Sequence, residues 1–460
     1  MSQSTQDVSM EKVATMASRE AWRNAVKGSL KRRNRKEVTF KAMGLAAVSI
    51  SVFFVLMLFT SIISKGLPAF WQTKIVAPVY FDPAVIQISP KPTQKAGETP
   101  QAFQERDFAW QSELGMVDWP VLLENTLIKA RPALEAQRAE LLSIYSTDQR
   151  FRLRDMVIND PSVIGKTVEM SLLADANVDV WLRGNIDRGL PDEQQQLSPE
   201  VRKIADELYA SDLIQLKFST ELFSNPDSRS APASAGLAGA FMGSLYMMLI
   251  VIFVAVPLGV ASAIYLEEFA PKNRLTDLVE VNINNLAAVP SIVFGLLGAA
   301  IFINYFKLPL SAPLVGGLVL SLLTLPTVII ATRASLKAVP PSIRQAALGL
   351  GASKMQSVFH HTLPLAVPGI LTGVIIGIAH AVGETAPLLL IGMSAFVASI
   401  PASPMDQATA LPVQIYLWQG NELRNFFEAR TSAAIMVLLA LLLSLNGLAI
   451  WLRKKFETRW

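Results

Sequence analysis

The 460-residue sequence contains no cysteine and only three histidines. Without cysteine the chain has no disulfide framework, no thiolate metal site and no cysteine nucleophile. His360, His361 and His380 are too few and too poorly spaced to form a metal site from imidazoles alone. We therefore predict neither a structural metal nor a bound cofactor.

Charged residues are also scarce. They make up 17% of the chain, whereas 51% of it is hydrophobic, which is more apolar than an ordinary soluble domain. A helix needs about 20 apolar residues to cross the hydrocarbon core of a bilayer, and helices are expected because lipid offers no water to satisfy backbone polar groups. Six segments meet this requirement: Ala42–Ile63, Ala238–Leu266, Ile283–Phe306, Pro313–Ala334, Leu365–Met393 and Ala433–Leu452.

Basic residues flank the first and the last apolar segment, which favours a cytoplasmic position for both chain ends. The basic residues on these flanks include Arg32, Arg33, Arg35, Lys36, Arg453, Lys454 and Lys455. A cleaved signal peptide is a competing interpretation of the first segment, but this segment is long and begins only at Ala42. We expect residues 1–41 to be cytoplasmic, residues 42–64 to form the first span of a multi-pass protein of the bacterial inner membrane, and residues 238–460 to form the membrane core.

A polar stretch, residues 65–237, separates the first two spans and carries a net charge of −6, although the whole chain carries +4. The predicted topology places this stretch in the periplasm. Arg131–Tyr145 and Ser198–Leu213 have the pattern of amphipathic helices, Gln215–Phe223 that of a strand, and Asp82–Gln104 that of a linker. The stretch is either a solvated spacer or a small α+β domain.

The chain offers no site for nucleotide hydrolysis. Gly165-Lys166-Thr167 ends like a phosphate-binding loop, but Asp160 stands where that motif requires glycine. We find no arrangement of nucleophile and base either, so we predict that this chain is not an enzyme. Any ATP would have to be bound by another subunit.

The segment after the fourth span predicts a short cytoplasmic helix, within a connecting loop at residues 337–364. Pro340 and Pro341 end the preceding span, and Ser342 is a predicted helix cap. Gly349 and Gly351 are expected to end the helix and allow a tight turn. Small residues on this helix would let another protein pack closely. The residues that we expect to contact such a partner are Ser342, Arg344, Gln345, Ala346, Ala347, Leu350 and Gly351.

This segment resembles the conserved cytoplasmic loop of ATP-binding-cassette (ABC) importer permeases. Gln345-Ala346-Ala347, then Gly351, then Leu363-Pro364 match that loop in spacing. Gln345 departs from the usual glutamate, which leaves the helix intact but removes a possible salt bridge to the ATPase. His361 departs from the usual aliphatic residue. The resemblance implies an all-α, six-span type I ABC importer permease fold, with a soluble insert between the first two spans.

A narrower resemblance, to the permeases of phosphate importers, extends from about Gly236 to the C-terminus. It rests on four segments: residues 284–295, 324–330, 383–389 and 410–416. This resemblance implies transport of inorganic phosphate. It also implies a second homologous permease subunit, a pair of ATPase subunits and a periplasmic phosphate-binding protein as partners. We expect membrane lipid to be a partner as well, but no nucleic acid.

Ionisable residues inside a span are costly and commonly mark a transport pathway. His380 and Glu384 lie one helical turn apart, and Arg333 lies in the last turn of the fourth span. We hypothesise that Glu384 pairs with Arg333 or His380, and that Arg333 donates hydrogen bonds to an oxyanion in transit. Arg333 could instead extend to the lipid headgroups. Asn284 and Asn285 are uncharged donors that could also line the pathway.

Three other functions remain open from the residues alone. The chain could carry another oxyanion, such as sulfate or molybdate. It could be a secondary transporter, although we find no pair of interrupted spans in matching positions. It could also be a membrane sensor, although its cytoplasmic tails are short.

Overall fold

The computed structural model of this chain describes residues 3–456, which fall into two compact units, residues 1–64 and 65–460. The first unit lies within a single helix, α1 (Gln3–Gly66). The side chains of its apolar segment, including Phe53, Phe54 and Leu56, are exposed within this chain. An apolar helix of this kind suits a lipid environment.

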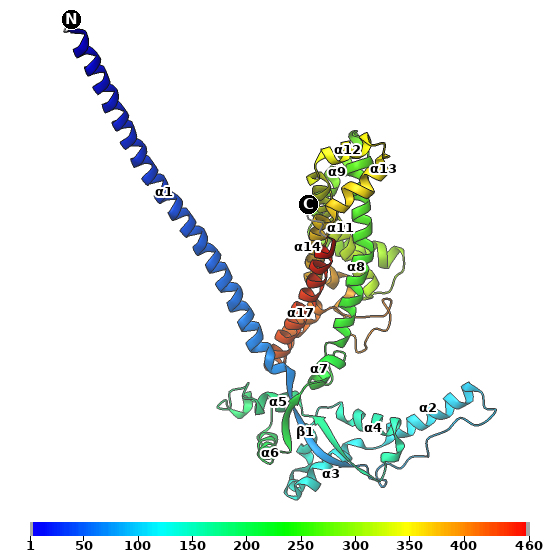
Figure 1. Cartoon of the computed structure of the whole chain (residues 1–460). Coiled ribbons are helices and arrows are strands. Elements are labelled where there is room, and N and C mark those ends of the chain that lie inside the picture. The colour runs from blue at the N-terminus through cyan, green and yellow to red at the C-terminus, as the bar shows by residue number, and fades with distance from the viewer. Residues whose placement is uncertain (1–2, 457–460) are drawn as a thin grey trace. The chain divides into compact units, whose positions relative to one another are not determined.

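Four long helices of the second unit form a bundle in which α8 packs on α11, α11 on α14, and α14 on α17 (Figure 1). Their bounds are α8 Ala238–Ile264, α11 Pro313–Ala338, α14 Leu363–Gly383 and α17 Arg424–Phe456. Shorter helices connect them: α9 Arg274–Ala287, α10 Ser291–Gly298, α12 Pro341–Gly349, α13 Lys354–Gln356, α15 Ala386–Leu388 and α16 Leu411–Gln419. Among the described residues, five helices are long and apolar enough to cross a membrane. The number becomes six if the bent pair of Arg274–Ala287 and Ser291–Tyr305 counts as one span.

Two of the predicted spans are interrupted, which corrects the prediction of continuous helices there. The segment predicted as the third span bends by 104° between α9 and a helical stretch that runs over Ser291–Tyr305, because Pro290 lacks an N–H and disfavours a helical residue before it. The fifth predicted span stops at Gly383, since Pro387 would clash with the carbonyl of Gly383 in a continuous helix. Two spans are therefore interrupted, at Pro290 and after Gly383.

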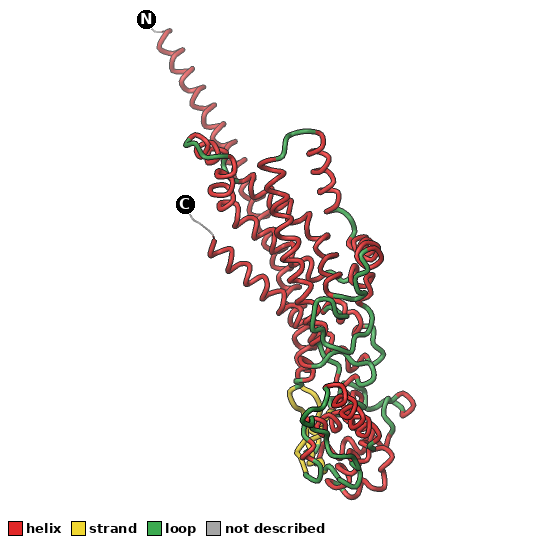
Figure 2. Tube along the Cα trace, turned by 90° about the vertical axis from the view of Figure 1, so that its right-hand side faces the viewer, coloured by secondary structure: helices red, strands yellow, loops and turns green. Residues whose placement is uncertain are grey.

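Residues 65–237 form a folded α+β domain, so the spacer interpretation was wrong. Its antiparallel sheet has the strand order β2-β1-β3, and Figure 2 shows the strands outside the helical bundle. The strands are β1 Trp71–Tyr80, β2 Thr167–Leu173 and β3 Ile214–Phe218. The helices are α2 Pro100–Met116, α3 Trp119–Ala130, α4 Gln149–Asn159, α5 Ala176–Leu182, α6 Pro199–Ala210 and α7 Glu221–Ser224.

The local predictions for this domain hold in part. The amphipathic helix predicted at Ser198–Leu213 is α6, and the hydroxyl of Ser198 caps it by accepting a hydrogen bond from the Val201 N–H. The helix predicted at Arg131–Tyr145 is instead a tighter 3₁₀ helix, Pro132–Ile144, with a kink at Gln137. Phe81, Leu114 and Leu141 are among the fully buried side chains of the domain core.

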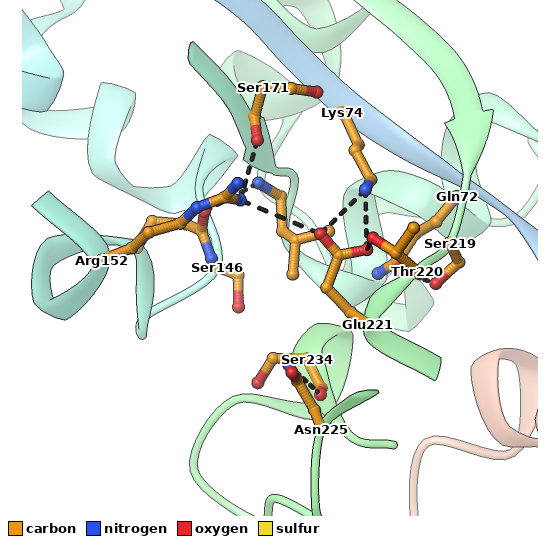
Figure 3. A network of polar contacts seen from close by, with 12 residues as sticks. Gln72, Lys74, Ser146, Arg152, Ser171, Ser219, Thr220, Glu221, Asn225 and Ser234 are labelled. Atoms are coloured by element: carbon orange, nitrogen blue, oxygen red, sulfur yellow. Dashed lines mark hydrogen bonds and ion pairs between the residues drawn. The ribbon is translucent and has the colours of Figure 1, made fainter. Parts of the chain in front are cut away.

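A nearly buried ion pair joins two elements of the domain, as Figure 3 shows. Lys74 of β1 donates to both carboxylate oxygens of Glu221 in α7, at 2.8 and 2.7 Å. Arg152 lies 3.9 Å from the same carboxylate and donates to the Ser171 carbonyl. Burial raises the pKa of Glu221, but hydrogen bonds and charge from Lys74 outweigh this effect and leave the pKa below its usual value.

Arg430 of α17 connects the domain to the bundle. This buried guanidinium donates to the Gln72 side-chain oxygen at 3.0 Å, to the Ala233 carbonyl at 2.8 Å and to the Ala235 carbonyl. All three acceptors lie in residues 65–237. Because removing a buried charge from its hydrogen-bond partners is costly, the domain is firmly attached to the start of α17.

Candidate coupling helix and intramembrane charges

The predicted short helix after the fourth span is α12, which begins at Pro341 and ends at Gly349. Gly351 has φ +89°, a conformation that favours glycine, so its predicted role in the turn is confirmed. The predicted cap was wrong: Pro340 occupies the cap position and Ser342 makes no capping hydrogen bond. Pro340 fixes the entry into the helix without a side-chain cap.

Arg344 attaches α12 to the ends of two long helices. Its guanidinium donates to Glu268 Oε1 at 3.0 and 2.6 Å, and also to the carbonyls of Leu336 and Val339 at 2.8 and 2.9 Å. Glu268 belongs to the π-helical turn that follows α8, and Leu336 belongs to α11. A force applied to α12 would therefore reach α8 and α11 together.

The exposed surface of α12 differs from the predicted one. Ala347 is buried within the chain, and Arg344 is half-buried in its ion pair. Gln345 and Ala346 are exposed, and Leu350 is 90% exposed directly after the helix. Arg344 and Ala347 face their own chain, and the other predicted contact residues remain exposed to another protein: Ser342, Gln345, Ala346, Leu350 and Gly351.

The next turn begins with a cap that our sequence interpretation missed. The Ser353 hydroxyl accepts from the Gln356 N–H, and the Gln356 side chain accepts from the Ser353 N–H. The signal was present, since serine followed three residues later by glutamine is a capping box. This box fixes the start of the helical segment that leads into α14.

Arg333 does not pair with Glu384. It donates to Glu280 at 2.6 Å and to Glu267 at 3.3 Å, which corrects the predicted partner. Lys337 lies 3.5 Å from the same Glu267. Since two carboxylates already occupy the guanidinium and would repel an anion, the predicted role of Arg333 as an oxyanion donor is not supported.

The other predicted pair is present. His380 Nε2 lies 3.1 Å from Glu384 Oε1, with the two side chains 58% and 17% exposed. Glu384 has extended backbone angles at the end of α14, so its carboxylate stands where the span is interrupted. The exposed His380 leaves this pair open to a further contact on one side.

Close packing supports the interrupted segment. A Cβ at Gly295 would lie 2.7 Å from the Pro387 Cα, so α10 packs directly against the break. A Cβ at Gly373 would clash with the Ala331 side chain of α11, and a Cβ at Gly377 would lie 2.8 Å from the Thr324 methyl group. Small residues spaced in this way commonly mark a contact between membrane helices.

The predicted pathway residues do not form one cluster. Asn284 and Asn285 are exposed near the end of α9, before the bend. His380 and Glu384 lie at the other interruption, and Arg333 belongs to the ion pairs with Glu267 and Glu280. The sequence interpretation overlooked both glutamates. Glu267 stands next to Glu268 at the end of an apolar run, where acidic residues are costly without a cationic partner.

Comparisons with known proteins agree with this architecture. Residues 255–458 match the family described as "Binding-protein-dependent transport system inner membrane component", and residues 27–192 match a domain of unknown function, DUF3333. The chain is 34% identical to the phosphate transport system permease protein PstA of Yersinia pestis over 247 residues, which cover 53% of this chain and 80% of that protein. It is 35% identical to PstA of Mycobacterium leprae over 221 residues, which cover 47% of this chain and 70% of that protein.

Two further matches are more limited. The chain is 32% identical to the probable ABC transporter permease protein YqgI of Bacillus subtilis, over 38% of this chain and 58% of that protein. The methionine ABC transporter MetNI in an inward-facing conformation matches with 18% identity and a TM-score of 0.37, over 47% of this chain and 94% of the matched chain.

The family match places this bundle of apolar helices, with its short connecting helix tied to the ends of two of them, among the transport permeases. The chain belongs to the PstA family of ABC transporter permease subunits.

Proposed function

We propose that this chain is the permease subunit of an ATP-driven importer of inorganic phosphate. The observation that carries the proposal is the 34% identity to a phosphate transport permease over 80% of that protein's length. Phosphate would cross as an ion and would not be chemically altered. Hydrolysis of ATP would occur on a separate ATPase pair, because the sequence has no nucleotide-binding loop.

The proposed assembly also contains a second homologous permease subunit and a phosphate-binding protein outside the membrane. Both chain ends would lie in the cytoplasm and residues 65–237 in the periplasm, as the basic flanks favour. In this arrangement α12 is the coupling helix, which receives the ATPase on Gln345, Ala346 and Leu350. Arg344 would pass the motion to α8 and α11 through Glu268 and Leu336.

Within the membrane we assign His380 and Glu384 to the phosphate pathway. A bare carboxylate repels an anion, so Glu384 would act by orienting the His380 ring, to which it lies close. The exposed side of His380 would then face the pathway shared with the second permease. Asn284 and Asn285 would offer neutral donors nearer the cytoplasm.

The test is uptake by the reconstituted complex in proteoliposomes. The chain would be purified with its second permease and ATPase, and supplied with the binding protein and internal ATP. ATP-dependent accumulation of radiolabelled phosphate, with little accumulation of sulfate or molybdate, would support the proposal. Preference for sulfate or molybdate would overturn the substrate, and uptake by the isolated chain without ATP would instead indicate a secondary transporter.

A further inference from the structure

Four aromatic side chains form a continuous exposed surface on the domain of residues 65–237. We call this surface, made of Phe70, Trp71, Phe218 and Phe223, the aromatic ledge. The Phe70 and Phe223 rings stack at 5.6 Å between centroids, Phe223 and Phe218 stack at 6.1 Å, and Trp71 meets Phe218 edge-on at 6.2 Å. Trp71, Phe218 and Phe223 remain 41%, 51% and 45% exposed.

The ledge includes the end of an edge strand. β3 pairs only with β1 in the order β2-β1-β3, and Leu216 on the same face of β3 as Phe218 is also 51% exposed. Natural proteins usually protect such edges with charges or cover them. A contiguous apolar surface of this kind marks a contact with lipid or with another protein.

The position of the ledge relative to the apolar part of α17 favours lipid. A Cβ on Gly66 would lie 2.7 Å from the Met436 sulfur and 2.9 Å from the Ala433 nitrogen, so Gly66 packs against α17 there. Ala433 is where the apolar run of α17 begins. Gly66 therefore lies at the edge of the hydrocarbon core.

The ledge follows directly in the chain. Residues 67–70 form a 3₁₀ helix, which rises about 2 Å per residue, so the Trp71 backbone lies within about 10 Å of Gly66. The headgroup layer is about 5–8 Å thick on each side of the hydrocarbon core. An aromatic side chain is long enough to reach from the Trp71 backbone into this layer. A protein partner would have to fit into this narrow space between the ledge and the bilayer.

We propose that the aromatic ledge rests in the lipid headgroup layer, so that the membrane surface is a binding partner of this domain. Trp71 suits this depth because its indole combines an apolar face with a polar N–H. The three phenylalanine rings add apolar area that can enter the boundary between headgroups and acyl chains. Together with Arg430, whose guanidinium binds the Ala233 carbonyl, the ledge gives the domain two attachments. One attachment is to α17 and the other is to lipid.

The absence of cysteine makes a direct test possible. Single-cysteine variants Phe218→Cys, Phe223→Cys and Leu216→Cys would be labelled with a nitroxide in the whole transporter, reconstituted in bilayers of phosphatidylethanolamine and phosphatidylglycerol. Electron paramagnetic resonance would compare collisions with oxygen, which enters lipid, and with a nickel chelate, which stays in water. Phe108→Cys is the matched control, because Phe108 in α2 is 74% exposed on the same domain.

We expect the ratio of oxygen to nickel collisions at 216, 218 and 223 to exceed that at 108 by at least threefold. Ratios equal to that of the control would show a water-facing ledge and would overturn the proposal. Exclusion of both reagents at the ledge would also overturn it, because it would show that another protein covers the surface. The Leu216 variant keeps all four rings, so its ratio of oxygen to nickel collisions can be measured even if a phenylalanine variant fails to fold. None of these outcomes depends on which ion is transported.

Discussion

The Arg344 guanidinium lies 2.6 Å from Glu268 Oε1, which joins the short helix α12 to the turn that follows α8. The Glu268 side chain is 8% exposed and the Arg344 side chain 22%. A partly buried, charge-assisted contact of this kind resists separation better than a surface pair. If α12 is pushed by an ATPase, this pair would carry the push to α8.

We therefore expect Arg344→Gln to reduce phosphate uptake about tenfold while ATP binding by the complex stays unchanged. The substitution removes the ion pair and leaves Glu268 without its cation. Uptake and nucleotide binding would be measured on the same reconstituted complex. Lys337→Gln is the control, since its 59% exposed side chain lies 3.5 Å from Glu267. Full uptake by the Arg344 variant would show that α12 transmits motion by another contact.

Arg333 gives a second prediction, because its position supports a structural role. Arg333→Met leaves Glu280 without its cation and Glu267 with Lys337 alone, so we expect a loss of about 2–3 kcal/mol in stability and no change in the KM for phosphate. Thermal unfolding and uptake kinetics of the purified complex would be compared. A raised KM with unchanged unfolding would restore Arg333 to the phosphate pathway.

The pair at the interrupted span gives a third prediction. Glu384→Gln keeps the size of the side chain but removes the charge that faces His380 at 3.1 Å. We expect at least a tenfold fall in maximal uptake at equal membrane expression. Glu422→Gln, at an exposed position before α17, serves as the control. Equal uptake by both variants would remove Glu384 from the mechanism.

The topology can be tested with single cysteines, because the native chain has none. Leu350 and Met116 are both 90% exposed, one after α12 and the other at the end of α2. An impermeant maleimide added outside intact spheroplasts should label Met116→Cys and should label Leu350→Cys only after the membrane is permeabilised. The opposite pattern would invert the proposed orientation.

The Lys74–Glu221 pair predicts a pH dependence. The folded-state pKa of Glu221 is below its usual value, so its stabilising contribution is present above the unfolded-state pKa. That contribution is lost as the pH falls through the lower, folded-state pKa. Glu221→Gln should cost about 3 kcal/mol at pH 7, and the difference from the unmodified protein should shrink below about pH 4.

Thermal unfolding of the whole complex, followed by tryptophan fluorescence at several pH values, would measure this effect. Arg154→Gln is a suitable control because the Arg154–Asp155 pair is exposed, and such pairs contribute about 0–1 kcal/mol. A Glu221 variant whose deficit stays constant with pH would show that the carboxylate charge does not stabilise the fold.

Much of the membrane region could be predicted because its signals are local. The apolar runs that became α8, α11 and α17 depend only on composition and length. The end of α12 at Gly349 and the turn at Gly351 depend on backbone properties of neighbouring residues. The His380–Glu384 pair follows from helical spacing alone.

The contacts between distant segments were not predictable in the same way. The sequence offered Arg333 several acidic partners, and the packing of α9 and the turn after α8 against α11 selected Glu280 and Glu267 over Glu384. Pro290 and Pro387 were visible as helix breakers, but helices elsewhere continue through Pro257 and Pro326. Neighbouring helices decide whether a proline in a membrane span interrupts it.

The sequence by itself determined that this chain crosses a membrane several times, carries an acidic insert and presents a short helix between two spans. These properties follow from hydrophobic length, charge and local backbone preference. Only the tertiary structure decided that the insert packs around its own core, that Ala347 faces inward, and that Arg430 and the aromatic ledge lie where the domain meets α17. Such facts depend on which distant surfaces bury each other, and local sequence preferences do not specify that choice.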